Sequence, residues 1–351
     1  MGKILIIRFS SIGDIVLTSP VLRAVRNKYP ESFISMLIKE EFMPLVADCP
    51  YLDEVIVFKK NGGVINLAKK LRENKYDIII DIHHNLRSLY LDYTLSTEKR
   101  LIYKKRILKR WLLLNLHLNL MDKNAGVIDR YFEALKPLGI ENDKNGLELW
   151  INRNDEEKAI EFLRKHDDNV REIFIGLAPF AHWETKCWPL DYYVKLINLI
   201  TREINCRFIV FGGPGDGEKL GSSFKNLTNK PVMALGALNL MAQAALLKRC
   251  CYFISNDTGL MHIADAAGVP LLTFFGPTVR EFGFAPVNKN SVVLSRDLKC
   301  RPCSLHGSRN CPRGTLECLK LITPEEAAEK VLNYLRANNI DSIKKTPAFP
   351  S

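Results

Sequence analysis

The sequence has no apolar run near the roughly 18 uninterrupted residues that a membrane-spanning helix needs. It also lacks low-complexity tracts and short-period repeats, which excludes collagen-like and wholly disordered chains. Neither GxGxxG nor GxxxxGK[ST] occurs after a strand, which argues against ordinary dinucleotide and P-loop sites. The N-terminal apolar run is short, ends at Arg8 and has no small-residue cleavage site, so we predict no signal peptide and a cytoplasmic protein.

Composition is that of a globular chain with a basic surplus. The 351 residues are 47% hydrophobic, and this length predicts two domains that each bury a core. The formal net charge of +11 favours an anionic partner, namely a phosphorylated ligand, an acidic membrane surface or nucleic acid. In a cytosolic chain the nine cysteines are expected to be reduced, buried or metal-bound rather than paired in disulfides.

Short apolar runs alternate with amphipathic stretches along the first half of the chain. The runs predict buried strands at residues 3–9, 33–38, 54–58 and 77–82, with helices between them, for example at residues 19–29 and 64–74. A polar stretch at residues 141–158 is where we place the inter-domain connection.

The alternation then starts again. We predict strands at residues 173–178, 206–211, 232–235, 252–255 and 270–275, and helices at residues 190–203, 217–226, 240–249 and 260–267. Continuous apolar strands separated by helices indicate parallel sheets covered on both faces. We therefore predict an α/β protein with two Rossmann-like domains, residues 1–150 and 165–323, facing each other across a cleft. Thr323 as N-cap and Pro324 in the first turn predict a C-terminal helix at residues 324–340.

The turn after the first strand carries the first candidate site. Ser10, Gly13 and Asp14 lie where backbone N–H groups could meet an anion or a sugar. Asp14 falls at the carboxyl end of the strand, where a carboxylate could act as a catalytic base. The alternative is that Asp14 only caps the next helix and that Gly13 serves turn geometry alone.

A second strand-to-helix turn spans residues 255–262. The N–H groups of Thr258, Gly259 and Leu260 suit a phosphate at a helix N-terminus. Asp257 would repel a diphosphate and is better suited to accept hydrogen bonds from sugar hydroxyls. The alternatives are an N-capping role for Asp257 and a place in the core for His262.

Two further loops follow strands of the second domain. Lys186 is a point charge that could hold a phosphate without a metal, or a solvated surface lysine. The glycine-rich turn at residues 211–218 permits close backbone approach, and a carboxylate there, Asp216 or Glu218, could bind ribose hydroxyls.

Four cysteines have the spacing C-x2-C-x7-C-x6-C: Cys300, Cys303, Cys311 and Cys318. A structural zinc site is chemically plausible, and an iron–sulfur cluster fits the spacing less well. The alternative is a loop of reduced cysteines or an adventitious disulfide.

A basic segment runs from Arg87 to Arg110, with eight Lys or Arg against two acids, and Trp111 and three leucines follow it directly. Basic residues beside exposed apolar ones suit a peripheral contact with anionic lipids. The alternative is a solvated face beside a core helix. Nucleic acid fits less well, because no reading module is visible and aromatic residues are not interleaved with the basic ones.

Together and in this order, these segments resemble family 9 glycosyltransferases, the lipopolysaccharide heptosyltransferases. The resemblance covers about residues 3–335 and rests on residues 3–14, 186–189, 211–213, 256–262 and 275–278. Its most specific part is Asp-Thr-Gly-Leu-x-His at residues 257–262. The cysteine-bearing loop resembles that of the second inner-core heptosyltransferase.

The resemblance implies a GT-B fold and an inverting transfer of heptose from ADP-heptose to the lipopolysaccharide inner core, an acidic glycolipid, without a metal or cofactor. It implies that Asp14 is the base and Lys186 holds phosphate. Thr258, Gly259 and Leu260 would cradle the diphosphate, Asp257 would grip the sugar, and Glu218 or Asp216 would bind ribose. Relatives often carry small hydroxyl residues before the lysine, whereas this chain has Ala181-His182-Trp183, which leaves His182 to substitute in the phosphate contact. A transferase that uses a UDP- or dTDP-sugar and a non-catalytic sugar-nucleotide-binding protein stay open as alternatives.

Overall fold

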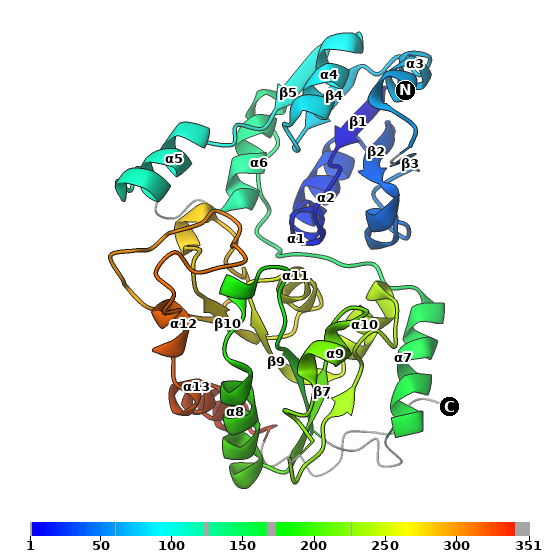
Figure 1. Cartoon of the computed structure of the whole chain (residues 1–351). Helices are drawn as coiled ribbons and strands as arrows, with labels where there is room; N and C mark the ends of the chain where they lie inside the picture. The colour runs from blue at the N-terminus through cyan, green and yellow to red at the C-terminus, as the bar shows by residue number, and fades with distance from the viewer. Residues whose placement is uncertain (1, 60, 123–125, 167–172, 226, 341–351) are drawn as a thin grey trace. The chain divides into compact units, whose positions relative to one another are not determined.

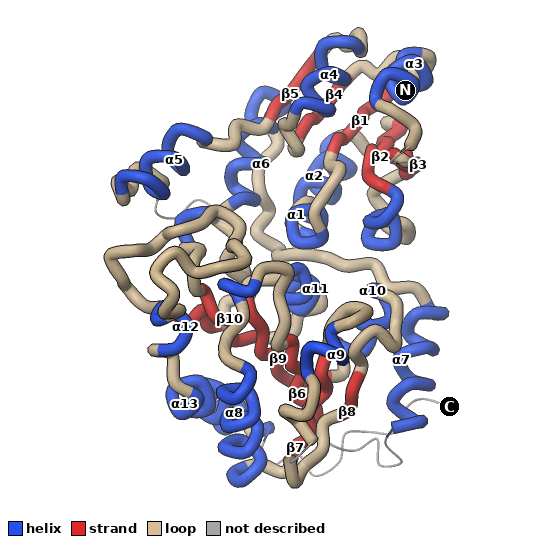
Figure 2. The backbone as a smooth tube through the Cα atoms, in the orientation of Figure 1, coloured by secondary structure: helices blue, strands red, loops and turns tan. Residues whose placement is uncertain are grey.

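The computed structural model describes residues 2–59, 61–122, 126–166, 173–225 and 227–340. The chain forms two compact units. Unit 1 consists of Met1–Lys109 and Met121–Trp150, and unit 2 consists of Arg110–Leu120 and Ile151–Ser351. Each unit contains one parallel sheet (Figure 2).

The sheet of unit 1 has five strands in the order β3-β2-β1-β4-β5. Their bounds are β1 Lys3–Ile7, β2 Phe33–Lys39, β3 Glu54–Phe58, β4 Ile78–Asp81 and β5 Lys99–Ile102. The helices of unit 1 are α1 Ile12–Val16, α2 Ser19–Lys28, α3 Val64–Arg72, α4 Leu86–Thr94 and α6 Val127–Leu135, with 3-10 turns η1 Glu40–Leu45 and η2 Lys136–Leu138. Helix α5 Ile107–Leu116 begins at the end of unit 1 and belongs mostly to unit 2. Strands β1 and β4 each contain a run of successive apolar residues that is buried, as a parallel sheet covered on both faces requires.

The sheet of unit 2 has six strands in the order β11-β10-β9-β6-β7-β8. Their bounds are β6 Ile173–Ala178, β7 Cys206–Val210, β8 Val232–Met233, β9 Cys250–Asn256, β10 Leu271–Phe275 and β11 Val292–Ser295. The helices are α7 Arg153–His166, α8 Leu190–Glu203, α9 Asp216–Leu220, α10 Leu240–Leu247, α11 Gly259–Ala266, α12 Glu317–Lys320 and α13 Pro324–Ala337, with 3-10 turns η3 Glu184–Lys186 and η4 Arg280–Phe282. Helices α8 and α13 pack beside one another (Figure 1).

An aromatic cluster ties together distant parts of unit 2. The ring of Trp188, two residues before α8, stacks on that of Phe274 in β10 with centroids 4.3 Å apart. The Trp188 indole Nε1 donates to the carbonyl of Ile322, 3.0 Å away, just before α13. Because Trp188 is only 1% exposed, this contact fixes the loop before α8 against the sheet.

Each sheet reverses its strand order at one place. In unit 1 the chain runs outward from β1 to β3 and returns to β4 on the other side of β1. In unit 2 it runs from β6 to β8 and returns to β9 on the other side of β6. Two neighbouring loops diverge at such a switch point, which leaves a crevice beyond the carboxyl ends of the strands. The segments that carry the candidate site residues follow β1 in unit 1, and β6 and β9 in unit 2.

The predicted fold class is confirmed: the protein is α/β with the two Rossmann-like units of the GT-B class. Most predicted elements are present within a few residues, and the predicted strand at residues 173–178 and helix at residues 190–203 match β6 and α8. The predicted helix at residues 217–226 is shorter as α9, because Gly221 leaves the helical conformation with a positive φ; residue 226 itself lies outside the described residues. Helix α7 begins inside the predicted linker and packs against α10 in unit 2.

Candidate functional site

Lys186 and Asp257 form an ion pair at the switch point of unit 2. The Lys186 Nζ lies 2.6 Å from Asp257 Oδ2, and the two side chains are 13% and 9% exposed. Thr278, which follows β10, donates its hydroxyl to the same carboxylate at 2.8 Å. Three loops, after β6, β9 and β10, therefore converge on one carboxylate. The structure thus brings together two predicted site residues from segments about 70 residues apart.

Asn256, the last residue of β9, holds this arrangement in place. Its side-chain oxygen accepts from the backbone N–H of Trp188 at 3.0 Å, and its amide nitrogen donates to the carbonyl of Pro179 at 2.8 Å. Asn256 is fully buried and so bridges both ends of the loop that carries Lys186.

The N-terminus of α11 lies directly after Asp257. Its N-cap is Thr258, in extended conformation, so Asp257 is not the N-cap of this helix. The Thr258 Oγ1 is buried with no hydrogen-bond partner among the described residues. The first N–H groups of any helix lack acceptors within the helix. Thr258, Gly259 and Leu260 therefore place donors and the positive end of the helix dipole next to the ion pair.

The remaining predicted residues of unit 2 lie in three different settings. His262 is 4% exposed, one turn into α11, with its ring 6.4 Å from that of Phe284, so it occupies a core position. His182 is exposed, with its ring 4.8 Å from that of Trp183. The Asp216 carboxylate accepts from the Gly213 N–H at 2.8 Å and pairs with a lysine, which closes the glycine-rich turn. Glu218 is exposed on α9.

A long loop after β11 contacts the segments that carry Thr278 and Lys186. We call residues 296–318 the cysteine loop. The Arg301 guanidinium in this loop donates to the carbonyls of Phe275 and Thr278, at 3.0 and 2.7 Å. At the loop's other side, the Ser308 N–H donates to Thr185 Oγ1 at 2.8 Å, next to Lys186. Sequence reasoning gave Arg301 no such role, because its partners are backbone carbonyls that no side-chain motif reveals.

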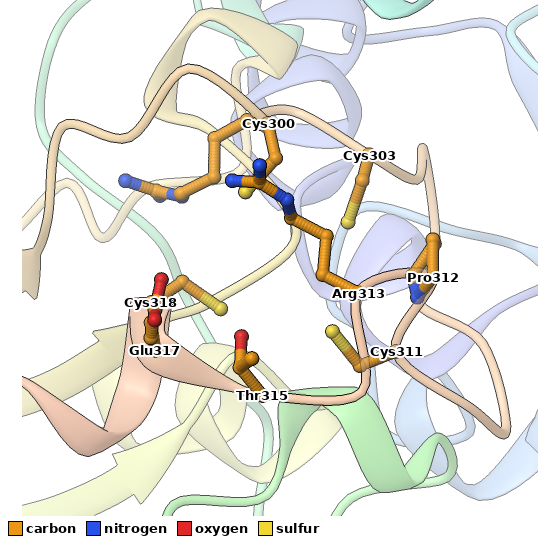
Figure 3. Close-up of a pocket in the computed structure, with 9 residues that line it drawn as sticks. Cys300, Cys303, Cys311, Pro312, Arg313, Thr315, Glu317 and Cys318 are labelled. Atoms are coloured by element: carbon orange, nitrogen blue, oxygen red, sulfur yellow. The ribbon is translucent and has the colours of Figure 1, made fainter.

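The four predicted cysteines all line one cavity of about 30 Å³ in this loop (Figure 3). All four are free thiols. As the side chains stand in the described part of the chain, no three His, Cys, Asp or Glu residues are arranged to hold a metal ion. Burial raises the pKa of the Cys318 thiol to about 11. Burial also acts to raise the pKa of Cys311, but backbone N–H groups of Leu316, Arg313, Thr315 and Gly314 outweigh it and lower that pKa.

In unit 1, Asp14 lies at the switch point and forms an ion pair with Arg8. The Arg8 guanidinium is 2.5 Å from Asp14 Oδ1, and the Asp14 side chain keeps 21% of its exposure. Asp14 Oδ2 also accepts from Ser11 Oγ at 2.8 Å and from the Ser11 N–H at 3.2 Å. Asp14 is the third residue of α1 and closes a capping box with Ser11, so it does cap this helix, which leaves the role of a base untested. One carboxylate oxygen faces Arg8 and the other faces Ser11.

The Arg8 side chain is buried and makes several contacts besides the one with Asp14. It is 5% exposed, donates to the carbonyls of Ser10 and Ile82, and lies 5.7 Å from the centre of the Tyr131 ring. Burial alone would lower the pKa of Arg8, but Tyr131 and Asp14 raise it above its ordinary value, so it stays charged. Of the other predicted residues in this turn, Ser10 accepts a hydrogen bond from Arg8 with its backbone carbonyl. Gly13 is a buried residue of α1.

His83, after β4, completes the surroundings of Arg8. Its ring packs edge-on against Phe9 with centroids 5.3 Å apart. Burial, with a smaller contribution from Arg8, lowers the pKa of His83 to about 3, so the ring is neutral at neutral pH. Sequence reasoning missed Arg8 and His83. A charged residue at the end of a buried apolar strand was the signal available for Arg8.

Residues 64–312 match the model of glycosyltransferase family 9 (heptosyltransferase). Among characterised proteins, lipooligosaccharide heptosyltransferase 2 of Haemophilus influenzae is 26% identical over 356 aligned positions, covering 95% of this chain and 99% of the relative. Lipopolysaccharide heptosyltransferase 2 of Escherichia coli is 25% identical over 299 positions, covering 80% and 84%. Among solved structures, a family 9 glycosyl transferase of Veillonella parvula superposes with a TM-score of 0.80 at 24% identity, covering 96% of this chain and 98% of that one. The E. coli ADP-heptose heptosyltransferase II superposes with a TM-score of 0.72 at 22% identity, covering 96% and 99%. The family match spans well over half of the sequence, and the chain belongs to glycosyltransferase family 9 (heptosyltransferase).

Proposed function

We propose that this protein transfers heptose from ADP-heptose to the inner core of a lipopolysaccharide, with inversion at the anomeric carbon and without a catalytic metal. The observation that carries the proposal is the Lys186–Asp257–Thr278 cluster beside the N-terminus of α11. A nucleotide sugar carries a diphosphate next to a sugar, and this cluster offers a cation and N–H donors next to a hydroxyl-binding carboxylate.

Unit 2 holds the donor in this proposal. Lys186 and the N–H groups of Gly259 and Leu260 bind the diphosphate, and they stabilise the charge that the leaving ADP gains. Asp257 holds the Lys186 ammonium in position and accepts hydrogen bonds from sugar hydroxyls. His182 adds to the phosphate contact from the exposed loop before Lys186. Glu218 is the better candidate for the ribose hydroxyls, because Asp216 already accepts from its own turn.

Unit 1 supplies the base. Asp14 accepts the proton of the acceptor hydroxyl while that oxygen bonds to the anomeric carbon. The bond from this carbon to the diphosphate oxygen breaks, and ADP leaves with the electron pair. Entry opposite the leaving group inverts the configuration. Asp14 belongs to unit 1 and Lys186 to unit 2.

A membrane contact in the basic segment fits an acceptor that is a phosphorylated glycolipid. At the end of this segment, Ile107 and Leu108 are each 70% exposed and Trp111 is 52% exposed, next to exposed Lys104. Apolar side chains flanked by lysines suit a surface of anionic lipids. Among the described helices, none is both long enough and apolar enough to cross a bilayer.

Vesicle binding tests this contact. We expect the full chain to float with vesicles that contain phosphatidylglycerol but not with pure phosphatidylcholine vesicles. Ile107→Ser with Trp111→Ser should weaken flotation, whereas Val287→Ser, at a 42% exposed apolar position in unit 2, should not. Equal flotation of all three proteins would contradict the contact.

A donor screen tests the reaction. Calorimetry with ADP and UDP measures base preference, and mass spectrometry detects heptose added to a purified inner-core acceptor. We expect ADP to bind more tightly than UDP and the acceptor to gain one heptose. Preference for UDP would point to another nucleotide sugar, and binding without turnover would point to a non-catalytic protein.

A further inference from the structure

We propose that the cysteine loop binds one divalent transition-metal ion, with zinc the expected ion, through Cys300, Cys303, Cys311 and Cys318. The ion has a structural role behind the donor site, so this proposal does not depend on the identity of the sugar transferred. Its four ligands are spread along one loop, and binding closes that loop.

The four sulfurs share one small cavity. Figure 3 shows the side chains of Cys303, Cys311 and Cys318 directed into the space that the loop encloses. The cavity of about 30 Å³ is of the size that holds one small ion or water. Its lining is otherwise poor in ligands, with Arg301, Pro312, Arg313, Thr315 and Glu317 completing the wall.

The sulfurs do not yet stand at metal-ligand distance, since no three metal-binding side chains in the described residues are so arranged. All four are free thiols on one loop, and rotation about each Cα–Cβ bond moves a sulfur without moving the backbone. Four thiolates around a divalent ion form the tetrahedral set that zinc prefers, at about 2.3 Å per bond. Each thiol loses its proton to solvent on binding, and no electron is transferred.

The loop also provides for the charge of such a site. Four thiolates and one divalent ion carry a net charge of −2, which needs compensation in a partly buried place. Arg301 and Arg313 both line the cavity. Residues 313 to 316 place backbone N–H groups near Cys311. N–H donors of this kind stabilise a thiolate and orient it.

The ion would brace the donor site through contacts already described. Arg301, between Cys300 and Cys303, donates to the carbonyl of Thr278, whose hydroxyl bonds Asp257. Ser308, between Cys303 and Cys311, bonds Thr185 next to Lys186. Closing the loop on a metal therefore fixes both partners of the Lys186–Asp257 pair.

Metal analysis of the full chain tests the proposal. Protein produced in zinc-supplemented medium and purified without chelator should contain about one metal ion per chain. Cys303→Ser with Cys311→Ser should lose the ion, whereas Cys251→Ser, a half-buried cysteine outside the loop, should keep it. Titration of the wild-type thiols with a mercurial should release the ion as four thiols react, which needs no variant to fold. Iron in place of zinc, at one ion per chain and lost in the double variant, would also support the four-thiolate site.

Three results would overturn the proposal. Metal-free wild-type protein that takes up no stoichiometric zinc would do so, and so would metal retained by the double variant. A disulfide among the four cysteines in protein purified under reducing conditions would do so as well. Heptose transfer by metal-free protein would leave the proposed reaction intact, so the two proposals fail separately.

Discussion

The Lys186 ammonium lies 2.6 Å from the Asp257 carboxylate although the two residues follow different strands of the sheet. Strands β6 and β9 are hydrogen-bonded neighbours, and the chain leaves them in opposite directions. Both loops therefore emerge at the same edge with a crevice between them. The Lys186 ammonium therefore stands in this crevice with Asp257 as one partner, and its three N–H donors leave it able to meet an anionic ligand as well.

The first prediction concerns Lys186→Ala. We expect kcat/KM to fall by about 10²–10³ and the affinity for ADP to fall with it, because the variant lacks the cation that stabilises the leaving diphosphate. The variant also leaves Asp257 buried without its counter-ion, which costs about 3–5 kcal/mol of stability in comparable buried pairs. Enzyme kinetics, calorimetry with ADP and thermal unfolding measure the three effects.

Lys219→Ala is the matched control for Lys186→Ala. Lys219 also pairs with an aspartate, but its side chain is 55% exposed and lies on α9. We expect little change in stability from this exposed pair. If Lys186→Ala bound ADP as tightly as the wild type, Lys186 would not be the phosphate-binding residue.

Asp14→Ala separates the base from the donor site. Loss of a general base typically slows the chemical step by about 10²–10⁴, so we expect kcat to fall by that factor. The affinity for ADP should stay unchanged, since the proposed donor residues all belong to unit 2. Ser11→Ala, which removes only the hydroxyl donor to Asp14, is the control and should keep most of the activity. Transfer near the normal rate in Asp14→Ala would show that another group takes the proton.

We expect Arg8 to position Asp14, and Arg8→Lys tests this role. A lysine keeps the positive charge but cannot bond Asp14 and the carbonyls of Ser10 and Ile82 at once. We expect kcat to fall by about 10-fold or more with an unchanged affinity for ADP, and Arg8→Met to be worse. A purely structural role would instead lower thermal stability in both variants while the kcat of the folded fraction stayed normal.

The sequence predicts most of the strands, though not the edge strands β5 and β11, because buried parallel strands leave a strong local signal. Residues 78–80 are three successive isoleucines, and β4 forms there. Strand β5 was missed because Lys99 and Arg100, which begin it, are exposed at the sheet edge and look like part of a charged surface. Edge strands often carry such charges, so local composition hides them.

The residues of the candidate site also fall into those that a sequence motif predicts and those that it does not. Asp14, Lys186 and Asp257 could be predicted because each stands in a short motif after a strand. Arg8, Thr278 and Arg301 hold these residues through contacts between distant segments, many of them to backbone carbonyls. Such contacts depend on which strands become neighbours, and a linear pattern does not encode that.

The last prediction concerns Asp92, which is 1% exposed in α4 and faces Asp81 of β4. Burial and the neighbouring Asp81 charge raise the pKa of Asp92 to about 8. Between about pH 4 and pH 8 the folded protein therefore keeps a proton that the unfolded chain releases. The stability that this proton provides is present at low pH and is lost as the pH rises, by at most about 1.4 kcal/mol per pH unit.

Asp92→Asn keeps a donor toward Asp81 at every pH, so its stability relative to the wild type should grow from pH 5 to pH 8 in urea unfolding. Glu73→Gln, at an exposed position of unit 1, should follow the wild-type pH dependence. Parallel curves for Asp92→Asn and the wild type would show that Asp92 is ionised in the folded protein.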